Sequence, residues 1–217
     1  MKAVSSWRKD PESWLEGSFE RLPETVRVNP LRTDSKWVEE WISEQGGKPV
    51  PWFMGSGTAW EMPFSRGLAE GKTREMLIAL HETGRITRQE IVSMIPVLAL
   101  QVSTGDYVLD MCASPGSKTT QISEYLGEGG VVFANEISNS RVNTLVSNVH
   151  RHGSKSAVII NHDGRHLPKM PNRGFDKVLV DAPCTGSATT RKNPEVWQKW
   201  TPEGGRSLHD LQIELLR

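Results

Sequence analysis

Short apolar runs alternate with amphipathic segments through the second half of the chain. The runs are rich in Val, Ile, Leu and Ala, which is typical of buried strands, and we expect strands at Tyr107–Met111, Val131–Asn135, Ala157–Asn161 and Lys177–Val180. Apolar residues at helical spacing predict helices at Ser117–Leu126, at Ser138–Arg151 and after Thr201. Strands that alternate with helices in units of roughly 30 residues predict a doubly wound parallel α/β sheet.

The pattern before residue 85 is different, and six of the eight Trp residues lie in the first 60 positions. Val26–Val28 alternates like a strand, whereas Ser35–Glu44 and Thr73–His81 have helical spacing. Pro49–Arg66 contains Pro, Gly and aromatic residues, and we expect it to be irregular or short-stranded. We therefore expect a small N-terminal α/β domain and a larger second domain, at residues 1–85 and 86–217.

A further helix is expected at Thr87–Leu100, because Ile91, Met94, Ile95 and Leu98 would form an apolar stripe along it. Pro96 lies inside this segment. Proline removes a backbone donor, so we expect a kink or an end of the helix there.

Composition excludes several classes of protein. Lys+Arg and Asp+Glu both number 26, so attraction to nucleic acid must come from a local patch. No apolar run approaches the ~18 residues of a membrane span, and residues 1–20 lack the apolar core of a signal peptide. Cys112 and Cys184 are the only cysteines, too few for a disulfide framework or a structural zinc site. We expect a cytoplasmic protein without metal or membrane partner.

A loop of small residues, Cys112–Ser117, joins the first strand of the predicted sheet to its helix. The first N–H groups of a helix have no partner within it, so such a loop is suited to hold a ligand. It lacks the G-x-G-x-x-G and G-x-x-x-x-G-K-[ST] patterns, which argues against a dinucleotide dehydrogenase or a P-loop ATPase.

Acidic residues follow the other three predicted strands. Glu136 could hold both hydroxyls of a ribose, Asp163 could accept a hydrogen bond from an adenine amino group, and Asp181 follows the strand beside the first. Carboxylates would repel a phosphate chain but suit a cationic adenosine ligand such as a sulfonium. The alternative is that each acid caps a helix or lies in a solvated loop.

Cys184 lies in the loop Asp181–Cys184, with Arg191 and Lys192 nearby in sequence. A thiolate nucleophile needs an electropositive, partly exposed place, which this loop could supply. The alternative is a small buried cysteine without reactivity.

Four stretches together carry a more specific signal: Gln89–Pro96, Leu109–Gln121, Asn161–Asp163 and Asp181–Gly186. They resemble the RNA cytosine-5 methyltransferases of the Sun (nucleolar-protein) family, over most of residues 22–217. Five further segments resemble the branch of this family that methylates tRNA: Arg191–Asn193, Val196–Trp197, Lys199–Trp200, Pro51–Phe53 and Trp60. The resemblance implies a Rossmann-like fold, the cofactor S-adenosyl-L-methionine, an RNA substrate, which we expect to be tRNA, and an N-terminal domain that positions RNA. A monomer is expected.

The resemblance also implies roles for individual residues. The methionine and ribose part of the cofactor would be wrapped by Cys112, Ala113, Ser114, Pro115, Gly116, Ser117 and Lys118. Glu136 would hold the ribose, Asp163 would meet the adenine, and Asp181 would lie near the methionine end and the target base. Cys184 would assist product release. Beside the aromatic Trp197 and Trp200, RNA would be bound by Arg191, Lys192 and Lys199, for which an ordinary solvated loop is the alternative.

The family's attacking cysteine belongs to a Thr-Cys-Ser loop, and this sequence contains no Thr-Cys-Ser. We therefore expect a C-terminally truncated chain, lacking the last strands of the sheet, whose own methyl transfer is impaired. In one alternative Cys184 is itself the nucleophile, as the Pro-Cys cysteine is in DNA cytosine-5 methyltransferases. Two others are a non-catalytic module that binds cofactor or RNA, and an enzyme that uses an adenosine cofactor on another substrate.

Overall fold

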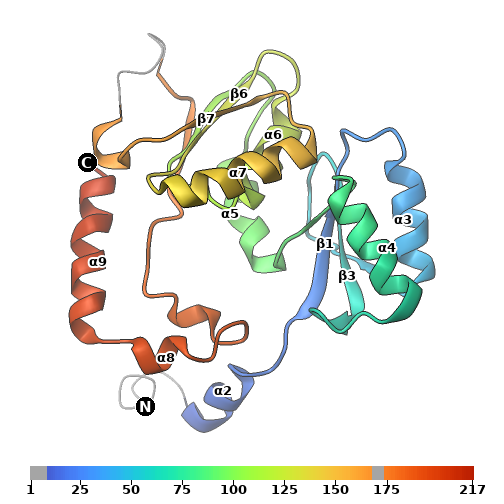
Figure 1. Ribbon diagram of the computed structural model, residues 1–217, viewed down its shortest axis with the longest axis horizontal. Coiled ribbons are helices and arrows are strands. Elements are labelled where there is room, and N and C mark those ends of the chain that lie inside the picture. The colour runs from blue at the N-terminus through green and yellow to red at the C-terminus, as the bar shows by residue number, and fades with distance from the viewer. Residues whose placement is uncertain (1–8, 168–173) are drawn as a thin grey trace. The chain divides into compact units, whose positions relative to one another are not determined.

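The computed structural model describes residues 9–167 and 174–217 (Figure 1). Its contacts divide the chain into two units, which are described separately. One unit is formed by residues 23–182, and the other joins the described residues before Pro23 to Pro183–Leu216. The domain boundary near residue 85 stays a prediction.

A four-stranded parallel sheet lies in residues 23–182, in the order β7-β6-β5-β8. Its strands are β5 (Tyr107–Asp110), β6 (Val131–Asn135), β7 (Ala157–Ile160) and β8 (Lys177–Leu179). All four strands expected from the sequence are confirmed to within one residue. The order runs outward from β5 to β7 and then reverses to β8, so the topological switch point lies between β5 and β8.

Three helices pack on this sheet: α5 (Ile95–Leu100), α6 (Ser117–Leu126) and α7 (Asn139–His152). Successive right-handed crossovers in one direction place α6 and α7 on the same face. One core joins Val97 of α5 and Ile122 and Leu126 of α6 to Val108 and Val132 of the strands. β8 forms one edge of the sheet, where Val178 is 45% exposed.

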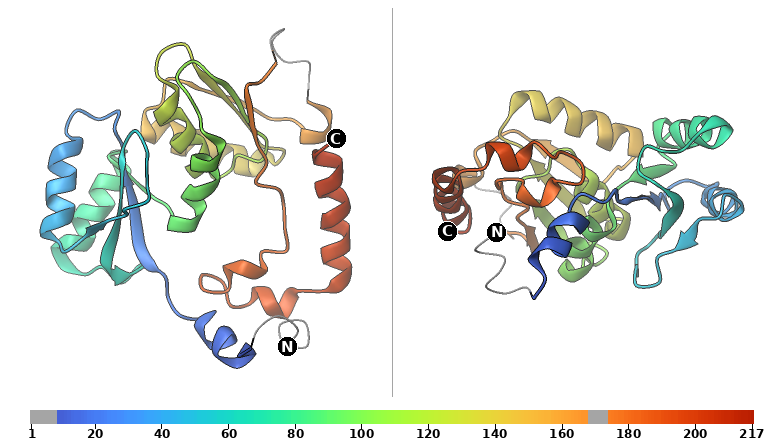
Figure 2. Two further views of the ribbon diagram at one scale, coloured as in Figure 1. Left: turned by 180° about the vertical axis from the view of Figure 1, so that it is seen from behind. Right: turned by 90° about the horizontal axis from the view of Figure 1, so that it is seen from below.

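An antiparallel sheet in the same unit has the order β2-β3-β1-β4. Its strands are β1 (Pro23–Val28), β2 (Lys48–Pro49), β3 (Thr58–Ser65) and β4 (Ile86–Arg88). The helices α3 (Ser35–Glu44) and α4 (Gly71–Glu82) cover one face of it, as Figure 2 shows. Val26 and Val28 of β1 point to this face and pack with Val38, Ile42, Leu77 and Leu80.

The helix expected at Thr87–Leu100 is wrong in its first half. Thr87 and Arg88 belong to β4, because they pair with Arg27 and Val26 of β1. Tertiary pairing thus overrides the helical spacing. A 3-10 turn at Ile91–Met94 follows, and α5 starts at Ile95 with Pro96 in its first turn. Proline is favourable there because that N–H has no helical partner, so it begins the helix rather than kinking it.

The other unit contains α2 (Pro11–Gly17), α8 (Val196–Lys199) and α9 (Pro202–Leu215). The helix expected after Thr201 is confirmed as α9, and the Thr201 hydroxyl caps it by accepting from the Gly204 N–H at 3.1 Å. The Trp197 ring stacks on Trp14, with centroids 6.1 Å apart. No helix among the described residues is long and apolar enough to cross a membrane.

Candidate functional site

The glycine loop between β5 and α6 is held by backbone contacts on both sides. The Ala113 N–H donates to the Asn135 carbonyl at the end of β6, at 2.8 Å. Gly116 has φ +104°, and a Cβ there would lie 2.9 Å from Leu145 Cδ1 of α7. A side chain at Gly116 would therefore be strained and crowded. The loop places the N-terminus of α6 at the carboxyl end of β5, beside the switch point.

Asp110 is the last residue of β5 and is buried. Its Oδ2 accepts a hydrogen bond from the Thr119 hydroxyl at 2.7 Å, whereas Oδ1 has no partner in the described part of the chain. Burial raises the pKa of this carboxyl to about 6, against the opposing effects of Thr119 and the nearby Lys118. In the sequence Asp110 is only a polar residue within the expected strand Tyr107–Met111, so its burial and its lack of a second partner among the described residues were missed.

Lys118 and Asp181 come together across the switch point. Lys118 Nζ of α6 donates to Asp181 Oδ2, which follows β8, at 2.7 Å. Lys118 is mostly buried and Asp181 is 58% exposed. The structure thus places Asp181 beside the glycine loop, as the strand order expected from the sequence requires.

Glu136 follows β6 and is buried. It accepts a hydrogen bond from the Ser138 N–H at 2.9 Å, and Arg141 Nη1 lies 3.4 Å from its other oxygen. The same Arg141 donates to the Ser114 carbonyl at 2.8 Å. Glu136 is therefore connected to the glycine loop through one arginine, at the same edge of the sheet as Asp110.

Asp163 follows β7 and is engaged locally. It accepts from the Arg165 N–H at 3.0 Å and forms an ion pair with the Arg165 guanidinium at 2.6 Å. The side-chain and backbone hydrogen bonds from Arg165 lower the pKa of Asp163 to about 2. The capping alternative is thus confirmed for Asp163, which caps the 3-10 turn Gly164–His166. Contact with an adenine stays a prediction.

The two cysteines differ in their surroundings. Cys112 is partly buried in the glycine loop. Burial, together with the charges of Asp110, Glu136 and Asp181, raises the pKa of the Cys112 thiol to about 11. Cys112 is therefore a thiol at neutral pH, which fits the wall of a pocket rather than a nucleophile. Cys184 belongs to the other unit and is exposed, so the buried alternative was wrong.

The expected RNA-binding residues also lie in the other unit. Arg191, Lys192 and Lys199 are all exposed, and Lys199 pairs with Glu195 at 3.2 Å. Trp197 contacts Trp14, and its indole N–H donates to the Ser187 carbonyl at 2.9 Å. Contact with RNA at these residues stays a prediction.

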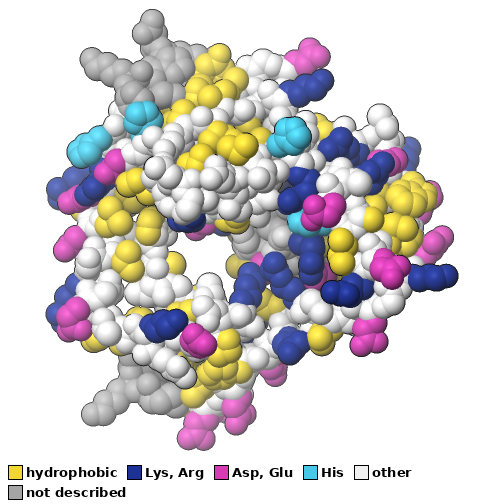
Figure 3. All heavy atoms as spheres, in the orientation of Figure 1, with side chains coloured by type: hydrophobic (Ala, Val, Ile, Leu, Met, Phe, Trp, Pro, Cys, Tyr) yellow, Lys and Arg dark blue, Asp and Glu magenta, His cyan; other side chains and the backbone are white. Residues whose placement is uncertain are grey.

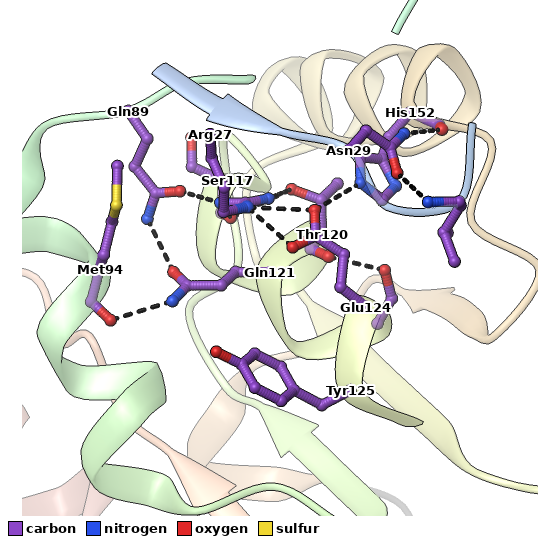
Figure 4. A network of polar contacts seen from close by, with 12 residues as sticks. Arg27, Asn29, Gln89, Met94, Ser117, Thr120, Gln121, Glu124, Tyr125 and His152 are labelled. Carbon is purple, nitrogen blue, oxygen red and sulfur yellow. Dashed lines mark hydrogen bonds and ion pairs between the residues drawn. The ribbon is translucent and has the colours of Figure 1, made fainter. Parts of the chain in front are cut away.

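A buried polar network that the sequence did not indicate connects the antiparallel sheet to α6 (Figure 4). Arg27 of β1 is fully buried, and its Nε lies 3.0 Å from both carboxylate oxygens of Glu124. It also donates to Thr120 Oγ1 at 3.0 Å and to the Ser117 carbonyl at 3.3 Å. His152 Nε2 lies 2.9 Å from Glu124. The network fixes the start of α6, the helix that follows the glycine loop.

The sheet order, the glycine loop and the acids at the strand ends define a Rossmann-like methyltransferase fold. The solved structure of a methyltransferase homologue from Pyrococcus horikoshii superposes with a TM-score of 0.73 at 27% identity, over 97% of this chain and 64% of that one. The profile of the 16S rRNA methyltransferase RsmB/F family matches residues 97–217. The chain belongs to this family.

Curated relatives agree with this assignment. The multisite-specific tRNA:(cytosine-C(5))-methyltransferase of Saccharomyces cerevisiae is 35% identical over 187 residues, which cover 77% of this chain and 27% of that protein. The ribosomal RNA small subunit methyltransferase F of Aliivibrio fischeri is 36% identical over 199 residues, which cover 90% of this chain and 41% of that protein. The chain thus spans less than half the length of these relatives.

Proposed function

We propose that this chain binds S-adenosyl-L-methionine and serves in the methylation of carbon 5 of cytosine in RNA. The observation that carries the proposal is the convergence of the glycine loop, Glu136 and the Lys118–Asp181 pair at the switch point of a sheet in an RsmB/F family member. Ligands of such sheets bind at this place.

The residues at the switch point fit that cofactor. The buried Glu136 carboxylate supplies acceptors for ribose hydroxyls, and Gly116 leaves room where a side chain would collide. Asp110 Oδ1, which has no hydrogen-bond partner among the described residues, offers a further acceptor beside the loop. Asp110, Glu136 and Asp181 place negative charge where a sulfonium would lie, which favours a cation over a phosphate chain. S-adenosylmethionine supplies the electrophilic methyl group.

The reaction needs a cysteine because carbon 5 of cytosine is a weak nucleophile. A thiolate that adds at carbon 6 makes carbon 5 electron-rich, carbon 5 takes the methyl group, and loss of its proton expels the thiolate. The raised pKa of Cys112 argues against this role for it. The exposed Cys184 assists product release in our proposal, and direct attack by Cys184 is the alternative.

RNA is the proposed substrate, and tRNA the proposed class. The similarity of Arg191–Asn193 and Lys199–Trp200 to the tRNA-methylating branch supports tRNA, and so does the name of the yeast relative. The family description and the Aliivibrio relative support ribosomal RNA as the second candidate. A monomer that acts in the cytoplasm completes the proposal.

Methyl-labelled S-adenosylmethionine tests the proposal directly. The chain is incubated with unmodified tRNA or with 16S rRNA transcripts, and nucleosides are analysed by mass spectrometry. If Cys184 attacks, we expect labelled 5-methylcytidine in tRNA and none after the Cys184→Ala substitution. If Cys184 only assists product release, we expect cofactor binding but neither label nor a covalent RNA–protein adduct, since Cys112 is the only other cysteine of this sequence and its raised pKa does not suit it to attack. Cys112→Ala is the matched control, since we expect it to keep the ability to form the thioether.

Cofactor binding without any methyl transfer would exclude direct attack by Cys184, whereas absence of cofactor binding would contradict the proposal. Labelling of another nucleoside would show that the site serves a different substrate. Labelling of 16S rRNA alone would replace tRNA by ribosomal RNA.

A further inference from the structure

A second pocket lies on residues 23–182 and adjoins the glycine loop, with which it shares Pro115, Gly116 and Ser117. It has a volume of about 250 Å³ and is lined by the turn that leads into β4, the start of α6 and the last turn of α7. Its basic lining residues, which we call the arginine pocket, are Arg66, His81, Arg88, Arg151 and His152. Figure 3 shows Lys, Arg and His side chains gathered on this face, below the end of α7 and beside α4.

Positive charge in the arginine pocket is only partly compensated. Glu24 is buried and pairs with Arg88, whose Nε donates to Glu24 Oε1 at 2.9 Å. Arg66 and Arg151 form no ion pair with any residue in 9–167 or 174–217. Within the described chain, the guanidinium groups of Arg66 and Arg151 are therefore available to bind an anion.

His81 and His152 report the same environment. Burial and the charge of Arg151 lower the pKa of His81, and Arg88 acts in the same direction, against a hydrogen bond to the Ile86 backbone and the charge of Glu82. His152 is buried, and its Nδ1 has no hydrogen-bond partner within the described chain. The other ring nitrogen of His152, Nε2, faces Glu124 at 2.9 Å. The effect of Arg151 and Arg88 on His81 shows that positive charge gathers in this pocket, which a bound anion would offset.

Backbone geometry gives the pocket a defined shape. Gly84 precedes β4 with φ +68°, and a Cβ there would lie 1.8 Å from the Arg151 carbonyl oxygen. Only glycine permits this approach of the turn to α7. The ten-residue helix α6 starts at the pocket with Gly116 and Ser117, so the positive end of its dipole adds to the arginines.

We propose that the arginine pocket binds a phosphate group of the RNA backbone. Planar guanidinium groups match phosphate oxygens in pairs, and a helix N-terminus adds N–H donors. The inference rests on the proposed function for the presence of RNA. It assigns RNA contact to Arg66 and Arg151, in addition to the residues around Arg191.

The test compares two double variants with equal loss of charge. Arg66→Ala/Arg151→Ala removes two arginines of the pocket, and Lys72→Ala/Arg74→Ala removes two exposed cations of α4 outside the pocket. Binding of fluorescein-labelled tRNA is measured by anisotropy over a series of salt concentrations. We expect the pocket variant to bind about tenfold or more weakly, with a salt slope lower by about one. The control variant stays within about twofold of the unsubstituted chain.

Competition with inorganic phosphate distinguishes binding of an RNA backbone phosphate from binding of a free anion. We expect phosphate to compete with tRNA and to move the His81 ring signals in NMR spectra, but not in the pocket variant. Equal loss of affinity in both double variants would overturn the proposal, because it would reflect general charge. Movement of the His81 signals by phosphate with unchanged tRNA affinity in the pocket variant would assign the pocket to a free anion. Retained S-adenosylmethionine binding in either case would leave the proposed function standing.

Discussion

Asp110 links the stability of the chain to its site. Burial is the largest influence on the Asp110 carboxyl, so its ionised form is disfavoured even though the Thr119 hydroxyl donates to it and Lys118 lies nearby. A folded-state pKa of about 6, above the ordinary 3.8, means that the folded chain binds a proton more tightly than the unfolded chain. The stabilisation by that proton is complete below pH 3.8 and is lost as the pH rises through about 6.

We predict that Asp110→Asn removes this loss. Asparagine keeps an oxygen that can accept from the Thr119 hydroxyl, but it does not ionise. Since one pKa unit is worth about 1.4 kcal/mol, the variant should gain roughly 3 kcal/mol relative to the unsubstituted chain between pH 4 and pH 7. Urea unfolding at several pH values measures the difference.

The lowered pKa of Asp163 does not interfere with this comparison. Its stabilisation is present above pH 3.8 and is lost only as the pH falls through about 2, outside the window. His81 contributes equally to both chains. Stability curves of the two chains that run parallel from pH 4 to pH 7 would show that Asp110 ionises without penalty.

At the scale of elements, α6 is the centre of the larger unit. It follows the glycine loop, packs on the parallel sheet through Ile122 and Leu126, and meets β1 through Glu124 and Thr120. The partner on β1 is Arg27, whose charge is removed from water by burial. Such a pair contributes little net stability, but it is costly to break because one charge stays buried.

Arg27→Met should therefore lower the free energy of unfolding by about 3–5 kcal/mol. Arg27→Met/Glu124→Leu should lose less than the single variant, because no carboxylate is left without its guanidinium. Lys199→Met is the control, since its pair with Glu195 is exposed and contributes little. Denaturant unfolding compares the three. A double variant that is less stable than Arg27→Met would contradict this account of the network.

The elements that could be predicted from the sequence are those fixed by local patterns. The four strands of the parallel sheet have apolar runs of the right length, and Gly116 and Thr201 mark the loop before α6 and the cap of α9. β4 could not be predicted, because its pairing with β1 is a contact between distant residues. The burial of Arg27 could not be predicted for the same reason. Alternation along β1 predicts that Arg27 lies on a polar face, but not that α6 covers this face.

At the scale of the whole molecule, strand order decides what the candidate site contains. Placement of β8 beside β5 brings Asp181 to Lys118, although 63 residues separate them. Placement of β6 on the other side brings Glu136 to the same edge. Asp163 and Cys184 illustrate what sequence position alone leaves open, because the first is a local cap and the second belongs to the other unit.

Calorimetric titration with S-adenosylmethionine and S-adenosylhomocysteine tests the central claim most directly. Both ligands should bind the unsubstituted chain. Glu136→Ala should bind about 10- to 100-fold more weakly, because a charge-assisted hydrogen bond to the ligand is lost. The matched control is Glu128→Ala, which removes an exposed carboxylate just before β6, at the amino ends of the strands and so opposite the candidate site. Circular dichroism confirms that each chain is folded. Absence of binding to the folded unsubstituted chain, or equal binding by Glu136→Ala, would contradict a cofactor site at the switch point.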